Sequence, residues 1–456
     1  MASIPIPTSA ASTAVPGRAR CSSSPLIPMR PPHESCSPAA VCSSPKSLDS
    51  ISGMAAIMVL TAGSTGDFEP FAALAEQLAR RGHVVTLTAD AGFERLAPGG
   101  PVKFAPIRAD FQSLVPTPDR KRPSLRGEVF PVMQSMLEDS WTVARSAQPE
   151  VIVAHEKSLA APHLAEKLGV PHVRALTVPM LTPTREFPLP GIVRHNLGAV
   201  LNRASYRLVG MLTRPYVGLI RDWRSESLAL GPRDHPPAPA KTLYCYSPSL
   251  VPTPMDWPPD TIATGFWLRE ERADAEPLNP DLESFLAAGA PPIYIGFGSS
   301  VGPDPAHLGA VVSDAVRQAG IRAVIASGWG ALTGIQSNSQ AMVIKSAPHR
   351  SLFPRVTAVV HHGGAGTTAA GLLASRPTII CPFQGDQHFW GAAVHRAGAG
   401  PQPMPVKKLV TRRLASAIQA AHDDDAMRTR AAELSERIAH ENGADRASER
   451  IESTLS

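Results

Sequence analysis

The chain has 456 residues, of which 47 are proline and 34 glycine, with 43% hydrophobic, 18% charged and 5% aromatic residues. This length predicts two or three domains with sizeable cores, and the share of proline and glycine is too low for a low-complexity chain. The formal charge of +5 comes without a long basic run or interleaved aromatic and basic residues, which argues against a nucleic-acid partner. No segment reaches about 18 consecutive apolar residues, so a spanning helix is not expected, whereas peripheral contact with a membrane stays open.

Residues 1–53 differ in composition from the rest of the chain. They hold 9 prolines, 13 serines and three of the five cysteines, Cys21, Cys36 and Cys42. With few large apolar side chains they cannot offset the entropy cost of ordering, so we predict a disordered leader. Two further hypotheses stay open: a targeting peptide, and an extension that results from a translation start assigned too far upstream. The two cysteines of the body, Cys245 and Cys381, are too few for a disulfide framework and favour a reducing, cytoplasmic location.

The body begins with a strand, a glycine-rich turn, a helix and a second strand. The apolar run 56–62 is followed by the turn 63–67, by apolar residues at helical spacing up to Leu78, and by the apolar run 83–88. This βαβ pattern predicts a parallel sheet with a right-handed crossover. Further strands are predicted at 150–154 and 171–175, around a helix at 160–168, and an amphipathic helical region at 192–230.

A second alternating α/β series follows the proline-rich segment 231–239. Its predicted strands are 293–297, 323–327, 342–344, 358–361 and 378–381, and its predicted helices are 305–319, 367–375 and 389–397. We therefore predict an α/β fold of two doubly wound, Rossmann-like domains with a ligand cleft at the carboxyl ends of their strands. The predicted domains are the leader 1–53, an N-terminal domain 54–235 and a C-terminal domain 236–456, whose last helix could pack back on the N-terminal domain.

The segment Val359–Thr368 has the pattern of a diphosphate site. An apolar strand ends in His361 and His362, glycines allow a ligand to approach the backbone, and Thr367 lies where a helix begins. A helix N-terminus favours an anion. Neither a Walker loop nor the nicotinamide-type glycine fingerprint is present here, and a tight turn that needs small residues is the structural alternative. Of the two histidines, either could face the ligand while the other is structural.

Two further strand ends carry polar side chains. Asp386 and Gln387 follow the strand 378–381 and suit the recognition of vicinal sugar hydroxyls, although Asp386 could merely cap the next helix. Asp67, in the first turn, is either a helix cap or a general base that takes a proton from an acceptor hydroxyl, or the residue that orients such a base. Ser299 and Ser300 are candidate phosphate donors, and Trp329 could stack on a nucleobase or belong to the core. We expect no metal site, because the run 423–425 resembles a solvated helix cap and the histidines lack ligand spacing.

At these residues the sequence resembles the glycosyltransferases of GT-B fold that include sterol 3-beta-glucosyltransferases and bacterial antibiotic glycosyltransferases. The resemblance covers roughly residues 55–450, and the sterol branch is the closer one. It is carried by the segments Thr61–Phe71, Thr182–Pro188, Trp223–Arg224, His361–Thr368 and Pro382–Gly391. The sequence departs from the plant secondary-metabolite branch, with Ala347-Pro348-His349 at the start of the corresponding box, so ribose recognition is unexplained.

The resemblance implies an inverting, metal-independent transfer of a sugar, with glucose expected, from a UDP-sugar to the hydroxyl of a lipophilic acceptor such as a sterol. By that similarity Asp67 takes the position of the base, His361, Gly364, Gly366 and Thr367 contact the diphosphate, and Asp386 with Gln387 binds the sugar hydroxyls. We also expect the donor site to include Gly63, Ser64, Ser299, Trp329 and Ala365. No cofactor is expected beyond the UDP-sugar co-substrate, and the protein is expected to act as a monomer. Two alternatives stay open: a nucleotide-sugar epimerase of the same fold, and an accessory homologue without catalytic activity.

Overall fold

The computed structural model describes residues 53–108, 123–233, 235–269, 277–298, 304–328 and 330–455, together with residues 300 and 302. The predicted leader apart from Gly53, and the candidate residues Ser299 and Trp329, lie outside these ranges. No helix within them is long and apolar enough to cross a membrane.

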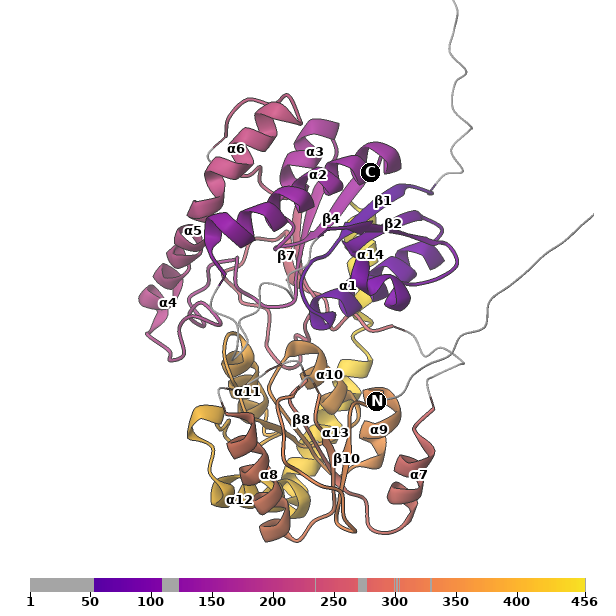
Figure 1. Ribbon diagram of the computed structural model, residues 1–456. Helices are drawn as coiled ribbons and strands as arrows, with labels where there is room; N and C mark the ends of the chain where they lie inside the picture. The colour runs from indigo at the N-terminus through magenta and orange to yellow at the C-terminus, as the bar shows by residue number, and fades with distance from the viewer. Residues whose placement is uncertain are drawn as a thin grey trace, which may run out of the picture. The chain divides into compact units, whose positions relative to one another are not determined.

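The first half of the chain forms a seven-stranded parallel sheet, in the order β3-β2-β1-β4-β5-β6-β7 (Figure 1). Its strands are β1 (Ala56–Leu60), β2 (Val84–Asp90), β3 (Val102–Ile107), β4 (Val151–His155), β5 (His172–Leu176), β6 (Lys241–Tyr244) and β7 (Thr261–Ala263). The sequence patterns miss β3, β6 and β7, which are at one edge or very short. Both β6 and β7 lie beyond residue 235, so the first sheet extends past the domain boundary that we drew there, and the boundary itself stays a prediction.

The second half forms a five-stranded parallel sheet, in the order β10-β9-β8-β11-β12. Its strands are β8 (Ile293–Gly296), β9 (Ala323–Ala326), β10 (Ala341–Ile344), β11 (Val359–His361) and β12 (Thr378–Ile380). Each lies within two residues of a predicted strand. The predicted fold class, two parallel α/β sheets, is therefore confirmed.

Helices pack against the faces of both sheets, as the continuous apolar runs of the strands require (Figure 1). In the first half these are α1 (Thr65–Arg80), α2 (Phe130–Ala147), α3 (Ala161–Leu168), α4 (Ala199–Ser205), α5 (Arg207–Thr213) and α6 (Val217–Glu226). In the second half they are α7 (Pro280–Ala287), α8 (Pro305–Ala319), α9 (His349–Leu352), α10 (Ala365–Leu373), α11 (Gln387–Arg396), α12 (Thr411–Asp423), α13 (Asp425–Ala439) and α14 (Gly443–Glu452).

The strand order places the polar turns of the sequence at two equivalent points. In the first sheet β1 lies between β2 and β4, and in the second sheet β8 lies between β9 and β11. At each of these points the chain changes the direction in which it adds strands, and the loops at the carboxyl ends diverge there. The turn after β1 therefore meets the loop after β4, and the turn after β11 meets the loop after β8.

The last helix of the chain, α14, packs against α1 of the first sheet. Ala447 and Ile451 are buried in the core that α1 forms with β1 and β2. At the rim, Arg81 donates to the carboxylates of Asp445 at 2.8 Å and Glu452 at 2.7 Å. The hydrogen bond from Arg81, with that from His83, lowers the pKa of Glu452 to about 2 despite its partial burial.

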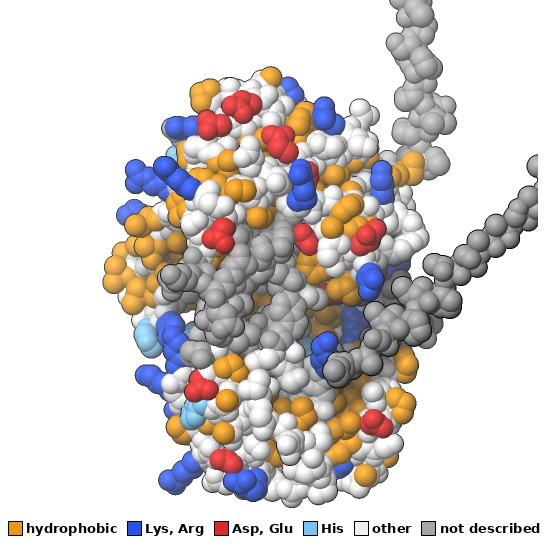
Figure 2. All heavy atoms as spheres, in the orientation of Figure 1, with side chains coloured by type: hydrophobic (Ala, Val, Ile, Leu, Met, Phe, Trp, Pro, Cys, Tyr) orange, Lys and Arg blue, Asp and Glu red, His pale blue; other side chains and the backbone are white. Residues whose placement is uncertain are grey.

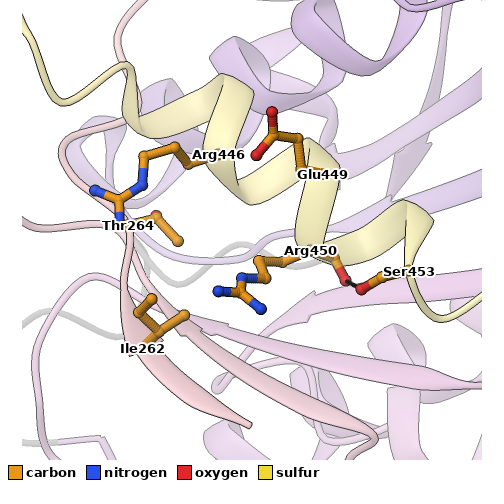
Figure 3. Close-up of a pocket in the computed structure, with 6 residues that line it drawn as sticks. All are labelled: Ile262, Thr264, Arg446, Glu449, Arg450 and Ser453. Carbon is orange, nitrogen blue, oxygen red and sulfur yellow. Dashed lines mark hydrogen bonds between the residues drawn. The ribbon is translucent and has the colours of Figure 1, made fainter. Parts of the chain in front are cut away.

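A cavity of about 230 Å³ lies between α14 and β7 (Figure 3). Ile262 and Thr264 line it from one side, while Arg446, Glu449, Arg450 and Ser453 line it from the helix. The Ser453 hydroxyl donates to the carbonyl of Arg450 at 2.9 Å. No candidate residue of the sequence analysis lines this cavity, so it plays no part in the site described next.

Candidate active site

The turn after β1 is organised around the carboxylate of Asp67, at the third position of α1. Its Oδ2 accepts the backbone N–H of Ser64 at 2.7 Å and the Ser64 hydroxyl at 3.0 Å. Gly63 has a φ of +129°, and a Cβ there would lie 2.3 Å from the same Oδ2. Glycine is thus needed at 63 both for the backbone conformation and for the space that the carboxylate occupies.

The loop after β4 supplies two cationic or protonatable partners to this carboxylate. Lys157 Nζ lies 2.8 Å from Oδ2 of Asp67, and His155 Nε2 lies 3.2 Å from Oδ1. The His155 ring is fully buried, and its Nδ1 accepts the N–H of Lys157 at 3.2 Å. Because Nδ1 is an acceptor, the neutral ring carries its hydrogen on Nε2, the nitrogen that faces Asp67.

These contacts keep Asp67 ionised. Burial raises the pKa of a carboxyl group, but here the hydrogen bond from His155 and the charge of Lys157 outweigh it and hold the pKa of Asp67 well below its ordinary value. Oδ2 faces three donors, whereas Oδ1 faces only His155. Oδ1 is therefore the oxygen with acceptor capacity left for a further hydroxyl.

The turn after β11 has the same shape with no acidic side chain. Gly363 has a φ of +95°, Gly364 is the N-cap of α10, and the first turn of the helix contains no acid. Within the described part of the chain, the backbone N–H groups of Ala365, Gly366 and Thr367 have no hydrogen-bond acceptor. The positive end of α10 is thus left open to an anion.

The two histidines of this turn have different environments. His361 is fully buried, and its Nδ1 accepts the N–H of Gly363 at 3.0 Å, which shapes the turn. Its Nε2 is buried without a hydrogen-bond partner among the described residues. His362 is half-buried, and its ring lies so close to the glycines at 298 and 364 that a Cβ on either would contact it, at 3.3 and 2.6 Å. Burial lowers the pKa of both rings, that of His362 to about 4, so both are neutral at pH 7.

Asp386 and Gln387, after β12, use part of their polar capacity within the loop. Asp386 makes no capping bond to α11, and its Oδ2 instead accepts from Trp390 Nε1 at 2.9 Å. Gln387 accepts the N–H groups of Phe383 and Gln384 at 2.7 and 3.0 Å with its Oε1. Its amide nitrogen lies 3.5 Å from the Ser300 hydroxyl. The side-chain oxygen of Gln387 is thus occupied by hydrogen bonds within the loop, and its side-chain N–H groups are the part that can donate to a ligand.

Contacts link the loops of the two sheets. Burial raises the pKa of Asp386, the charge of Asp67 raises it further, and the charge of Lys157 lowers it, so the three groups act on one another. A Cβ on Gly191 would lie 3.3 Å from the backbone nitrogen of Asp386. Lys157 is paired with Asp67 at 2.8 Å, and both charges are near enough to Asp386 to affect its pKa.

The segment Thr182–Pro188 has a structural role that the sequence did not reveal. The Thr184 hydroxyl donates to Asp256 at 2.6 Å, and Thr182 exchanges hydrogen bonds with the Tyr244 hydroxyl at 2.9 and 3.1 Å. Phe187 then packs edge-on against Phe389 of α11, with ring centroids 5.3 Å apart. This anchoring fixes the path of the chain into Gly191.

Arg224, from the predicted Trp223–Arg224 motif, is also structural. Its buried guanidinium donates to Glu166 at 2.7 Å and to the carbonyl of Gly231 at 2.9 Å, and it contacts His163 at 2.7 Å. These bonds tie α6 to α3 rather than to a ligand.

Comparison with known proteins agrees with this architecture. Residues 57–187 match the glycosyltransferase family 28 N-terminal domain, and residues 331–452 match the erythromycin biosynthesis protein CIII-like C-terminal domain. The chain therefore has the domain composition and the fold of the GT-B glycosyltransferases. The family resemblance drawn from the motifs is confirmed.

Curated relatives of the chain include sterol 3-beta-glucosyltransferases. Those of Arabidopsis thaliana named UGT80A2 and UGT80B1 are 34% and 32% identical, over 81% and 85% of this chain and 61% and 66% of their own length. A UDP-sugar-dependent glycosyltransferase 52 of Dictyostelium discoideum is 32% identical over 86% of this chain and 26% of its own. The chain thus spans between about a quarter and two thirds of the length of these relatives.

Solved structures of glycosyltransferases share the fold. The glycosyltransferase of kitacinnamycin has a TM-score of 0.68 and 19% identity, covering 89% of this chain and 99% of that one. The spinosyn forosaminyltransferase SpnP has a TM-score of 0.65 and 16% identity, covering 88% and 99%. SsfS6 from Streptomyces sp. SF2575, solved with thymidine diphosphate, has a TM-score of 0.57 and 18% identity, covering 87% and 99%.

His155 and Lys157 are the site residues that the sequence analysis missed. They directly follow the run 150–154, which was correctly predicted as a buried strand. Polar or charged residues at the carboxyl end of a buried parallel strand were the available signal. What the sequence could not show is that β4 pairs with β1, which brings this loop to Asp67.

Proposed function

We propose that this glycosyltransferase transfers a sugar, by inversion and without a metal ion, from a UDP-sugar to the hydroxyl of a lipophilic acceptor. The observation that carries the proposal is the pair of turns at the carboxyl ends of the two sheets, one with the carboxylate of Asp67 paired with Lys157 and the other with the open N–H groups of α10. The names of the relatives support glucose as the sugar and a sterol as the acceptor. Among the described residues no group of three His, Cys, Asp or Glu side chains could hold a metal.

On the acceptor side, Asp67 is the proposed base. As the acceptor oxygen attacks the anomeric carbon, its proton becomes strongly acidic and passes to Oδ1 of Asp67. A carboxylate with a low pKa is sufficient, because the oxygen that loses the proton is by then bonded to the sugar. Lys157 and His155 hold the carboxylate so that Oδ1, rather than Oδ2, is available.

On the donor side, the first turn of α10 is the proposed diphosphate site. The bond from the anomeric carbon to the diphosphate oxygen breaks, and the electron pair leaves with the nucleoside diphosphate. The free N–H groups of Ala365, Gly366 and Thr367 would stabilise this charge, together with the dipole of α10. Asp386, with one oxygen held by Trp390, and the amide nitrogen of Gln387 would bind sugar hydroxyls. A direct contact of the buried His361 with phosphate stays a prediction.

The deciding experiment measures release of the nucleoside diphosphate from UDP-glucose with a series of sterols and other hydrophobic alcohols, with and without a chelator. We expect release that depends on the acceptor and is unaffected by the chelator, and a product of inverted anomeric configuration. Conversion of the sugar without an acceptor would instead indicate an epimerase, and donor binding without turnover for any acceptor would indicate an accessory homologue. Thymidine diphosphate glucose, tested in parallel, decides the nucleobase.

A further inference from the structure

The helices α4 and α5 expose large apolar side chains along a segment that we call the apolar ridge, residues 192–214. Val200 is 78% exposed, Met211 69%, Leu201 57% and Leu212 54%. Ile192, Leu197 and Leu208 are also exposed. Figure 2 shows hydrophobic side chains gathered over α4 and α5 at one edge of the molecule. Isolated exposed apolar residues are common, but a contiguous group of this kind marks an interaction surface.

Helix α4 buries only polar side chains, which inverts the usual pattern of a helix in water, and the buried aromatic Tyr206 lies between α4 and α5. In α4 the buried residues are Asn202 and Ser205, and α5 buries none of its own. Asn202 accepts the N–H of Leu197 at 3.0 Å and donates to the carbonyl of Arg185 at 3.0 Å. The Ser205 hydroxyl accepts the N–H of Leu189 at 2.8 Å. The fold therefore holds the helix by hydrogen bonds with its apolar face turned outward.

The charge of the ridge has one sign. Residues 192–214 contain four arginines and no Asp or Glu. Arg203 pairs with Asp256 at 3.2 Å, whereas Arg194, Arg207 and Arg214 are exposed and form no ion pair within the described part of the chain. Exposed apolar residues flanked by free arginines complement a bilayer with anionic lipid headgroups.

The ridge begins at the candidate active site. Gly191, the residue before it, packs on the backbone of Gly385 and Asp386, and Phe187 packs on Phe389. A lipophilic molecule that leaves a bilayer beneath the ridge would thus enter beside the acid proposed to bind the donor sugar.

We propose that the apolar ridge docks on anionic phospholipid membranes and presents a membrane-dissolved acceptor to the active site. The delivery of an acceptor rests on the proposed function, whereas the docking does not. A second copy of the chain fits less well, because a two-fold interface would bring the same unpaired arginines face to face.

The test measures binding of the full chain to vesicles by flotation. The vesicles are phosphatidylcholine alone, or phosphatidylcholine with about one third phosphatidylserine. The probe variant replaces Val200, Leu201, Met211 and Leu212 together by Ser. The control variant replaces Val84 and Val410 by Ser; these two side chains lie outside the ridge and are 55% and 51% exposed. We expect the parent chain and the control to bind the anionic vesicles, and the probe variant to bind at least roughly tenfold less. Thermal unfolding should be unchanged, since the replaced side chains are exposed.

A second variant separates charge from apolar contact. Replacing Arg194, Arg207 and Arg214 by Gln should remove the preference for phosphatidylserine, as should high salt. Equal vesicle binding by the parent chain and the probe variant would overturn the proposal. So would a probe variant that changes only the sedimentation of the chain from dimer to monomer, because the ridge would then bind a second copy.

The role in acceptor delivery has a separate readout. The probe variant should keep the parent kcat with a dissolved, short-chain alcohol and lose at least roughly tenfold in rate with the acceptor held in vesicles. An equal loss with both acceptors would overturn the delivery role. If the chain transfers no sugar to any acceptor but still loses vesicle binding on substitution, the docking stands and the proposed function fails.

Discussion

Two turns of this protein have nearly the same backbone and opposite electrostatics. Residues 63–67 follow β1 and residues 363–367 follow β11, each with a glycine of positive φ, an N-cap and the first turn of a helix. Asp67 and Thr367 occupy the same position, the third of the helix. In the turn after β1, the carboxylate of Asp67 forms an ion pair with Lys157. In the turn after β11, the first N–H groups of α10 remain available to a ligand. The same backbone conformation thus positions the proposed base after β1 and the proposed anion site after β11.

Removing the acid from the first turn is expected to have the largest effect. Asp67→Asn keeps the shape of the side chain but cannot accept the acceptor proton, so kcat should fall by about 100- to 10,000-fold while affinity for UDP is unchanged. Steady-state rates of UDP release and calorimetric UDP binding measure the two quantities.

The control for this change is Asp424→Asn, at the N-cap of α13, whose side chain accepts the N–H of Met427. It should leave kcat at the parent value. Full activity of Asp67→Asn would show that the base is another residue.

An acid introduced into the turn after β11 should give this turn the negative charge that Asp67 gives the turn after β1. Thr367→Asp places a carboxylate among the free N–H groups of α10, so affinity for UDP should fall by roughly 10- to 100-fold through repulsion of the diphosphate. The neutral Thr367→Asn tests size alone and should bind UDP within a few-fold of the parent. Equal UDP affinity of the Asp variant and the parent would place the diphosphate elsewhere.

Removing the lysine that pairs with Asp67 from the loop after β4 tests what holds this carboxylate in place. In Lys157→Met the carboxyl loses the charge that helps to depress its pKa, so burial moves the pKa of Asp67 upward and the acid limb of the kcat profile should shift to higher pH. We also expect kcat to fall roughly tenfold, because the carboxylate is less well positioned. Lys167→Met, on the exposed end of α3, should leave the pH profile unchanged, and an unshifted profile in both variants would contradict a role for Lys157.

The smallest effect concerns the attachment of α14 to the helix that follows the first turn. The pKa of Glu452 falls from 4.5 to about 2 on folding, chiefly through its hydrogen bond from Arg81. A depressed pKa contributes stability above about pH 4.5, and this contribution is lost as the pH falls toward 2. Glu452→Gln should therefore cost about 1 kcal/mol at pH 7, since the pair is partly exposed, and progressively less below pH 4.5.

Urea unfolding at several pH values measures this cost. Glu449→Gln, one turn earlier on the same helix and without an ion pair in the described structure, is the matched control. A constant difference between Glu452→Gln and the parent across the pH range would rule out the ion pair as its cause.

Local patterns were sufficient for much of the fold and for the positions of both turns. Short apolar runs predicted β1, β4 and β11, because a buried parallel strand must be apolar on both faces. They failed for the three-residue β7 and for β3, whose residues are partly exposed at an edge. The sequence also did not predict that the apolar face of α4 points outward. Its periodicity indicates an amphipathic helix but not which face packs against the rest of the protein.

The sequence by itself determined that a small-residue turn precedes α10 and that an acid stands in the first turn of α1, because backbone conformation and capping are local properties. Only the tertiary structure decided what those groups can do. The pairing of β1 with β4 brought His155 and Lys157 to Asp67 and set its pKa, and the loop after β12 turned the Gln387 oxygen inward. Charge and hydrogen bonding act through space between residues far apart in the chain, so the chemistry of the site depends on the fold.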